Sequence, residues 1–211
     1  MMFQDRSDAG KQLAQKLLPY KAQKNTIVLG LARGGVVIAY EIAKTLSLPF
    51  NVLVPRKIGA PNCPELAIGA VAEDGQVWLN KSLIQILGLS DAWVQEAAAL
   101  AKQVGNERLK LYRKAAPLED LKGKTVLLID DGIATGATML AEIQSLRKQG
   151  VKAVITITPV ASKETWNLIR VVSDEAIALL VPENLQGISQ FYINFGQVED
   201  ETVLELLKAR R

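Results

Sequence analysis

The sequence contains no histidine and a single cysteine, Cys63, among its 211 residues. Without histidine, Ser-His-Asp triads, imidazole general bases and histidine-rich metal sites are excluded. A lone cysteine excludes a disulfide within the chain and suits a reducing compartment, so we expect a cytoplasmic protein. We expect Cys63 to be a neutral surface or packing residue rather than a nucleophile.

Long hydrophobic runs, aromatic residues and clusters of one charge are also scarce. No apolar run approaches the roughly 20 residues that a membrane span needs, and the polar N-terminal stretch does not resemble a signal or transit peptide. The formal charge is +3, but basic residues are dispersed among acids, and only four Phe, four Tyr and three Trp are available for base stacking. We therefore expect neither a membrane nor a nucleic-acid partner, whereas small anionic ligands remain compatible with the sequence.

What the sequence does have is an alternation of short apolar runs with segments of helical spacing. The chain, 49% hydrophobic, is long enough for one sizeable domain with a core. The alternation predicts an α/β fold, a mainly parallel central sheet flanked by helices. The expected strands are residues 26–32, 50–54, 125–130, 151–160 and 176–181. The expected helices are residues 9–18, capped by Ser7 or Asp8, and 36–46, 137–149 and 164–171.

The middle of the chain departs from this alternation. Residues 58–65 hold two prolines and a glycine, so we expect no regular structure there. Residues 66–79 are expected to form a hairpin that turns at Glu73–Gly75. Residues 81–113 are expected to form a helical insertion that Ser90 caps. One face of the insertion carries apolar side chains at helical spacing, which are Trp93, Ala97, Leu100 and Val104.

The most informative stretch is VLLIDDGIATGATM, residues 126–139. An apolar strand ends in Asp130 and Asp131, and a short loop then leads into a helix at Thr135–Thr138. Ligands of open α/β sheets bind outside the carboxyl ends of the strands, and the N-terminus of a helix suits a phosphate. Carboxylates accept hydrogen bonds from sugar hydroxyls. The pattern therefore predicts a site for a phosphorylated sugar, with Mg²⁺ or donated hydrogen bonds offsetting the repulsion between the acids. Each half of the stretch, taken separately, has a simpler interpretation. The alternative for the two aspartates is a polar turn, and the alternative for residues 135–138 is a helix cap.

This stretch resembles the signature of the type I phosphoribosyltransferases, which bind phosphoribosyl pyrophosphate (PRPP). The resemblance implies their fold, with a small hood formed by residues 183–211 and part of the N-terminus. It implies that Asp130 and Asp131 contact the ribose 2′- and 3′-hydroxyls, and that they assist Mg²⁺ mostly indirectly. It also implies a loop for the 5′-phosphate, made of Ala134, Thr135, Gly136, Ala137 and Thr138.

A second segment resembles the pyrophosphate loop of this family. Arg33, Gly34 and Gly35 follow the first strand, where glycines allow backbone N–H groups to face an anion and arginine supplies charge. The resemblance implies a cis peptide bond between Ala32 and Arg33. The alternative is an ordinary turn between a strand and a helix.

A third segment would complete the pyrophosphate site. Arg56 and Lys57 end the second strand and, by the resemblance, would bind pyrophosphate and stabilise its departure; the alternative is a solvated pair of cations. Residues 58–65 would be the mobile loop that closes over the reacting centre. Glu65 is the only carboxylate on that loop.

The chain is similar, within the family, to a poorly characterised bacterial group. The shared stretches are FQDRSDAGKQLA at the N-terminus, LARGG, RKIGAP and a C-terminal aromatic segment. In that segment Phe191 and Tyr192 would belong to the hood, where aromatic rings suit stacking on a base; packing against the core is the alternative. Ala32 and Cys63 stand where the group often has proline and asparagine.

The resemblance implies an enzyme. It would be a Mg²⁺-dependent phosphoribosyltransferase that moves 5-phosphoribosyl from PRPP to an acceptor, with a purine or pyrimidine base as the expected acceptor, and that works as a homodimer. The alternatives are a PRPP-binding sensor without transferase activity, and a subunit whose partner supplies activity. The sequence carries no determinant that selects one acceptor.

Overall fold

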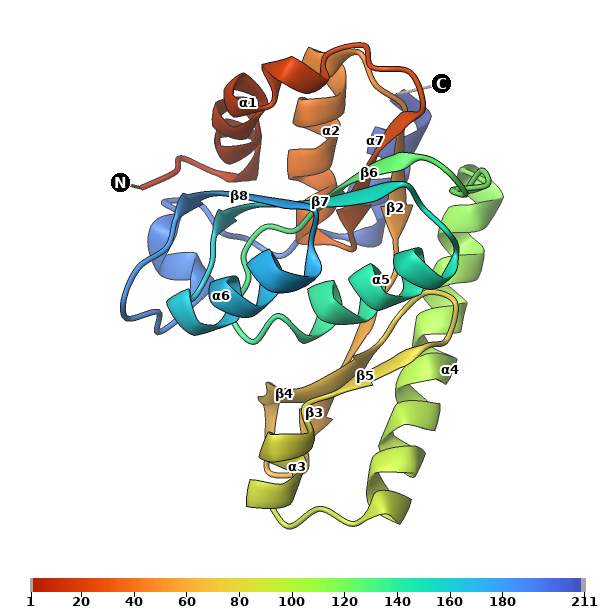
Figure 1. Ribbon diagram of the computed structural model, residues 1–211, viewed down its shortest axis with the longest axis vertical. Coiled ribbons are helices and arrows are strands. Elements are labelled where there is room, and N and C mark those ends of the chain that lie inside the picture. Colours follow the sequence, from red (N-terminus) through yellow and green to blue (C-terminus); the bar gives the residue numbers. More distant parts are fainter. Residues whose placement is uncertain (1, 210–211) are drawn as a thin grey trace.

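The computed structural model describes residues 2–209 and is an α/β protein (Figure 1). Five parallel strands form the central sheet in the order β2-β1-β6-β7-β8. They are β1 (Thr26–Leu31), β2 (Phe50–Leu53), β6 (Thr125–Ile129), β7 (Ala153–Val160) and β8 (Glu175–Leu180). The predicted fold class and strands are confirmed, with boundaries that shift by one or two residues. Because all five strands run the same way, their carboxyl ends share one edge.

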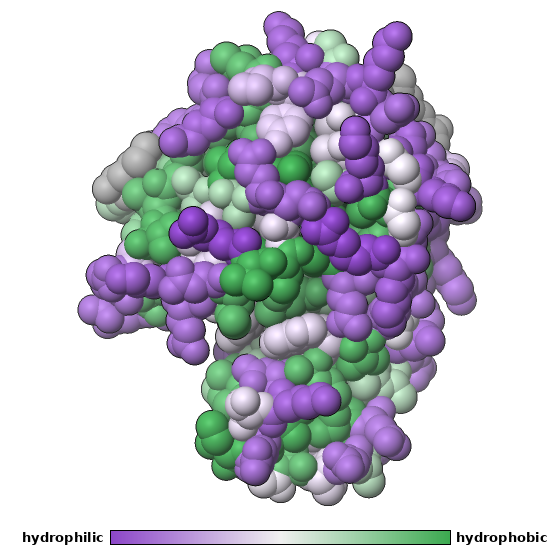
Figure 2. All heavy atoms as spheres, viewed as in Figure 1, coloured by the Kyte–Doolittle hydropathy of each residue, from purple (hydrophilic) through white to green (hydrophobic). Residues whose placement is uncertain are grey.

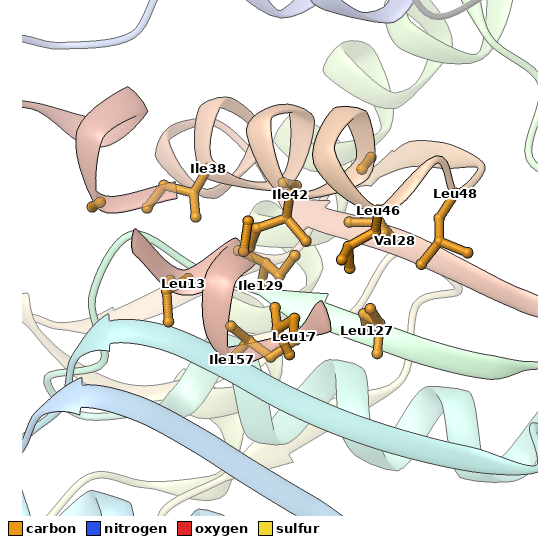
Figure 3. Packing of buried hydrophobic residues seen from close by; sticks show 14 of the residues in the cluster. Leu13, Leu17, Val28, Ile38, Ile42, Leu46, Leu48, Leu127, Ile129 and Ile157 are labelled. Carbon is orange, nitrogen blue, oxygen red and sulfur yellow. The ribbon is translucent and has the colours of Figure 1, made fainter. Parts of the chain in front are cut away.

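Helices cover both faces of this sheet (Figure 1). On one face lie α1 (Arg6–Lys16) and α2 (Gly34–Leu46), and on the other α5 (Ala137–Lys148) and α6 (Lys163–Val172). The first face is a tightly packed aliphatic layer (Figure 3), which includes Leu13, Leu17, Val28, Ile38, Ile42 and Leu127. The last helix, α7 (Asp200–Ala209), packs beside α2 and β2. Among residues 2–209, no helix combines the length and the apolar character that crossing a bilayer requires.

The first helix begins earlier than its sequence predicts. A start at Ala9 with Ser7 or Asp8 as the cap is wrong, because the Asp5 carboxylate accepts the Asp8 N–H at 2.8 Å and caps a helix that starts at Arg6. The Asp8 carboxylate turns back instead and accepts the Gln4 N–H at 3.0 Å. The two acids thus satisfy backbone donors on both sides of the helix start.

A second, antiparallel sheet follows β2. It contains β3 (Arg56–Ala60), β4 (Cys63–Val71) and β5 (Val77–Leu79). The predicted turn at Glu73–Gly75 is confirmed, with Gly75 at φ +87°. The prediction of irregular structure over residues 58–65 is wrong. Register shifts beside Gly59 absorb the irregularity within paired strands, and only Pro61 and Asn62 lie between β3 and β4.

Two helices complete this part of the chain, α3 (Lys81–Ile86) and α4 (Asp91–Ala115). The Ser90 hydroxyl accepts the Trp93 N–H at 3.3 Å, so the predicted helical segment and its cap are confirmed. The antiparallel sheet and α4 run side by side away from the central sheet (Figure 1). Figure 2 shows apolar residues gathered on this sheet and, separately, over α5 and α6.

A buried polar network attaches the antiparallel sheet to its neighbours. Glu142 of α5 is buried, and its Oε1 accepts the backbone N–H of Glu73 at 2.9 Å. The Glu73 carboxylate accepts the Val54 N–H at 3.1 Å and pairs with Arg113 of α4, whose Nη2 lies 2.6 Å from Oε2. The same guanidinium donates to the Val52 carbonyl at 2.7 Å. One set of hydrogen bonds thus joins β2, the hairpin turn, α4 and α5.

Glu142 makes stability depend on pH. Burial raises the pKa of Glu142 from 4.5 to about 8, although the hydrogen bond from Glu73 opposes the shift. The folded protein therefore holds this proton more tightly than the unfolded chain, and the free energy of unfolding falls as pH rises from 4.5 to about 8. We expect Glu142→Gln, which keeps the acceptor oxygen, to weaken this decline and to exceed wild type in stability above that range. Urea unfolding of both proteins at several pH values measures the free energy of unfolding.

The matched control is Glu164→Gln, which changes an exposed glutamate at the start of α6. It should reproduce the pH dependence of the wild type. If Glu142→Gln and wild type lose stability in parallel between pH 4.5 and about 8, the carboxyl of Glu142 does not hold the proton assigned to it.

Candidate functional site

The loop after β6 forms a cradle at the N-terminus of α5. Gly136 precedes the helix with φ +71°, and a Cβ atom there would overlap the Thr165 side chain, so only glycine fits without strain. The carbonyl of Ala134 accepts hydrogen bonds from the hydroxyls of Ser162 at 2.9 Å and Thr165 at 2.6 Å. These bonds hold the loop in front of the free N–H groups of the helix, where anions bind favourably.

A cavity of about 190 Å³ opens over this cradle, and we call it the phosphate-loop cavity. All five residues of the predicted 5′-phosphate loop line it, from Ala134 to Thr138. Asp130 at the end of β6 lines it as well, as do Lys57 and Glu65 from the antiparallel sheet. The structure thus brings together two parts of the chain that are far apart in the sequence, residues 57–65 and residues 130–138.

The two adjacent acids have different surroundings. Asp130 is half-buried, and its Oδ1 accepts the Asp131 N–H at 2.9 Å. Burial, followed by the charge of Asp131, raises the pKa of Asp130 well above its ordinary value. Asp131 instead forms an ion pair with Arg6, whose Nε lies 2.6 Å from Oδ2. The side chains of this pair are only 12% and 18% exposed.

Arg6 is the site residue that the sequence did not single out. It is the first residue of α1, and besides Asp131 it binds the Gly196 carbonyl through Nη1 at 2.7 Å. Its guanidinium lies 3.9 Å from the centre of the Phe195 ring, a cation–π contact. The only signal was its presence in the N-terminal stretch FQDRSDAG, whose role sequence alone does not reveal, because Arg6 and Asp131 are 125 residues apart.

The aromatic segment near the C-terminus packs on the same acids. The Tyr192 hydroxyl donates to the Asp131 carbonyl at 2.7 Å, and its ring contacts Phe3 and Phe195. Phe3 also exchanges backbone hydrogen bonds with Phe191 and Ile193, so the segments around Phe3 and Tyr192 run side by side. Tyr192 is 4% exposed, and burial raises the pKa of its hydroxyl. In this arrangement Tyr192 packs in the core, and Phe191 is half-buried beside it.

The predicted pyrophosphate loop lies against the same carboxylates. The peptide bond between Ala32 and Arg33 is cis, as the resemblance implies. A Cβ on Gly34 would overlap the Asp131 carboxylate, and one on Gly35 would lie 2.6 Å from the Ile129 carbonyl. These two glycines therefore permit the loop to approach the end of β6. Arg33 contacts Glu199 instead, with Nη1 to Oε2 at 3.2 Å.

The two predicted cations at the end of β2 belong to β3. Lys57 forms an exposed ion pair with Glu65 across the hairpin at 2.7 Å, and this hydrogen bond lowers the pKa of Glu65. Within residues 2–209, the exposed Arg56 side chain has no hydrogen bond or ion pair. Because the hairpin places Lys57 beside the phosphate-loop cavity, a cation and a carboxylate stand opposite Asp130.

The contact of Gly34 with the ion pair can be tested by substitution. A Cβ at this position would also lie 2.9 Å from Arg6 Nε, so Gly34→Ala must displace the loop or the pair. We expect Gly34→Ala to lower the free energy of unfolding by about 1–3 kcal/mol. A Cβ on Gly196 meets nothing within 4 Å, so Gly196→Ala should change stability by less than about 0.5 kcal/mol. Urea unfolding that gives equal values for both variants would contradict this packing.

Comparisons with known proteins agree with this geometry. The family model of the phosphoribosyl transferase domain matches residues 3–180. The putative phosphoribosyl transferase MT0597 of Mycobacterium tuberculosis is 38% identical over 207 residues, which are 98% of this chain and 46% of that protein. The chain thus spans less than half the length of this relative. Ribose-phosphate pyrophosphokinase of Pyrococcus furiosus is 26% identical over 144 residues, 66% of this chain and 49% of that protein.

The solved structures include a similar protein over the whole chain. TT1426 from Thermus thermophilus is 38% identical, covers 99% of both chains and superposes with a TM-score of 0.82. Together with the family model and the site geometry, these similarities show that the chain belongs to the phosphoribosyl transferase family.

Proposed function

We propose that this chain transfers 5-phosphoribosyl from PRPP to an acceptor, a purine or pyrimidine base, and releases pyrophosphate in a Mg²⁺-dependent reaction. One observation carries the proposal. The phosphate-loop cavity combines a helix N-terminus, the half-buried acid Asp130 and the cation Lys57. A phosphorylated sugar that ends in pyrophosphate needs these three chemistries side by side.

Different residues would bind different parts of PRPP. The 5′-phosphate would occupy the loop Ala134–Thr138, where backbone N–H groups and the two threonine hydroxyls donate to it. The ribose hydroxyls would donate to Asp130 from the cavity and to Asp131 beside it. Arg6 would hold the Asp131 carboxylate in place through its bond to Oδ2. The two acids would also offset the positive charge that develops on the sugar as its C1′–O bond breaks.

The leaving pyrophosphate would meet cations that are available to it. Arg56 has no ion-pair partner within residues 2–209, and the Lys57–Glu65 and Arg33–Glu199 pairs are partly exposed. Exposed ion pairs contribute little to stability, so these cations can exchange a glutamate for a phosphate at small cost. The N–H groups at Gly34 and Gly35, where α2 begins, would add donors for the same group.

Magnesium fits the site as a companion of PRPP. No group of three or more Cys, Asp or Glu side chains within residues 2–209 is arranged to hold a metal ion. The carboxylates that line the cavity, Asp130 and Glu65, are hard oxygen donors of the kind Mg²⁺ accepts, mostly through water. When bound with PRPP, Mg²⁺ would neutralise charge on the pyrophosphate.

The proposal also covers the hood, the helical insertion, the cellular compartment and the oligomeric state. The paired chain ends over Asp131 would form the hood on the acceptor side, and residues 81–113 an insertion within one domain. Cys63 is exposed and unpaired, which suits the cytoplasm. A homodimer would cover part of the exposed apolar surface of the molecule.

The decisive experiment measures pyrophosphate release from PRPP with Mg²⁺ across a panel of purine and pyrimidine bases. Release that depends on one base would support the proposal and name the acceptor. We expect Asp131→Asn and Arg56→Ala each to reduce turnover by about tenfold or more, because ribose positioning and charge stabilisation act in the transition state. Arg170→Ala, on an exposed arginine of α6, is the matched control and should turn over like wild type.

Binding of PRPP, measured by calorimetry, separates the remaining outcomes. PRPP that binds without release of pyrophosphate for any base would replace the transferase with a PRPP sensor. Near-wild-type turnover in both Asp131→Asn and Arg56→Ala would contradict the roles assigned to these residues.

A further inference from the structure

A second and larger cavity adjoins the phosphate-loop cavity. It has a volume of about 600 Å³ and lies between α4 and the β3–β4 hairpin; we call it the α4 cavity. Lys57 and Thr138 line both cavities, so the two meet at these residues. Ligand sites commonly measure about 300–1,000 Å³, and the phosphate-loop cavity alone is smaller than that range.

The charged lining of the α4 cavity is entirely cationic. Arg56, Lys57 and Arg108 line it, and no aspartate or glutamate does. Arg108 is neutralised by Asp200, with Nε 2.9 Å from Oδ1. Arg56 has no ion-pair partner within residues 2–209, and Lys57 has only its exposed contact with Glu65. The end of the cavity near Arg56 and Lys57 therefore favours an anion.

The opposite wall is apolar and belongs to α4. Trp93, Ala97, Leu100 and Val104 form this row and all line the cavity. Leu100 is 62% exposed and Val104 38% exposed, although a separate row of α4, with Val94 and Ala101, is already buried against the antiparallel sheet. Trp93 and Ala97 also pack partly against that sheet, so the exposed part of the row lies at Leu100 and Val104. A contiguous exposed apolar surface of this kind marks a binding site.

We propose that the α4 cavity binds an amphipathic anion, with its apolar body on the Trp93–Val104 row and its phosphate or carboxylate on Arg56 and Lys57. The row is about as long as three helical turns, which suits an aromatic ring system or a short alkyl chain. The charge of the lining selects against cations, and the apolar wall favours anions that carry an apolar body.

Because Lys57 serves both cavities, the ligand competes with pyrophosphate. Competition with PRPP itself rests on the proposed function, since it assumes that PRPP places its pyrophosphate at Arg56 and Lys57. Binding of the amphipathic anion and its displacement by inorganic pyrophosphate do not depend on any transferase activity.

The test is a fluorescence titration of the full chain with 8-anilinonaphthalene-1-sulfonate, an amphipathic anion. We expect saturable binding of about one equivalent and displacement by inorganic pyrophosphate. We expect Leu100→Glu to raise the dissociation constant by about tenfold or more, because it removes apolar contact and adds a repelling charge. Displacement by decyl phosphate or by adenosine monophosphate then tells whether the apolar body is an alkyl chain or an aromatic base.

The matched control is Val171→Glu, which makes the same change at a valine of α6 that is 82% exposed and outside the cavity. Its dissociation constant for the dye should stay within about twofold of wild type. Circular dichroism of both variants verifies that they are folded, and light scattering reports their molar mass.

Four results would overturn the proposal: no saturable binding, equal weakening by Leu100→Glu and Val171→Glu, no displacement by pyrophosphate, or no displacement by either organic phosphate. A lower molar mass for Leu100→Glu than for wild type would also overturn it, because the row would then be an interface between copies. If the dye binds as expected while no base supports pyrophosphate release, the proposed transferase fails and this site stands. If pyrophosphate is released while the dye does not bind, the transferase stands and this site fails.

Discussion

The constraint on which the rest of this structure depends is the charge of two adjacent carboxylates at the buried end of β6. Both side chains are half-buried, and the charge of Asp131 lies next to Asp130. Buried charges without partners cost several kcal/mol, so the surrounding chain has to supply compensation. Arg6 from the beginning of the chain pairs with the Asp131 carboxylate, whereas the Tyr192 hydroxyl donates to the Asp131 backbone carbonyl. The ion pair and the packing of aromatic rings together hold the segments around Phe3 and Tyr192 against the end of β6.

Local patterns made the central sheet and the phosphate loop predictable from the sequence. Apolar runs identify strands such as β1 and β6, and the position of Asp130 and Gly136 between a strand and a helix follows from the same pattern. Contacts between distant segments were not predictable. Nothing near Arg6 in the sequence indicates that it lies 2.6 Å from Asp131. The β3–β4 hairpin was missed because prolines and Gly59 argue against strands, whereas bulges and a short turn accommodate them.

The chain packs more closely on one side of Asp130 and Asp131 than on the other. Towards the chain ends, Ile188 fills the space over Gly132, and Arg6 covers Asp131, so side chains lie directly on the carboxylates. Towards the antiparallel sheet, two adjoining cavities lie between β3, α4 and the phosphate loop. The network of Glu142, Glu73 and Arg113 anchors that sheet at its turn, while the other end of the hairpin, with Lys57 and Glu65, lies at the cavity.

The pairing of the chain ends also affects how this protein is handled and how its gene is interpreted. Two features fix the position of Arg6. The Phe3 carbonyl accepts a hydrogen bond from the Ile193 N–H, and α1 begins at Arg6 itself. A start codon assigned a few positions downstream, an aminopeptidase, or a bulky affinity tag joined directly before Phe3 would each disturb the partner of Asp131 while leaving every strand of the central sheet intact. A preparation altered in this way would lack one wall of its site. Residues Phe3 to Arg6 are therefore part of the site itself and should be kept native in any assay.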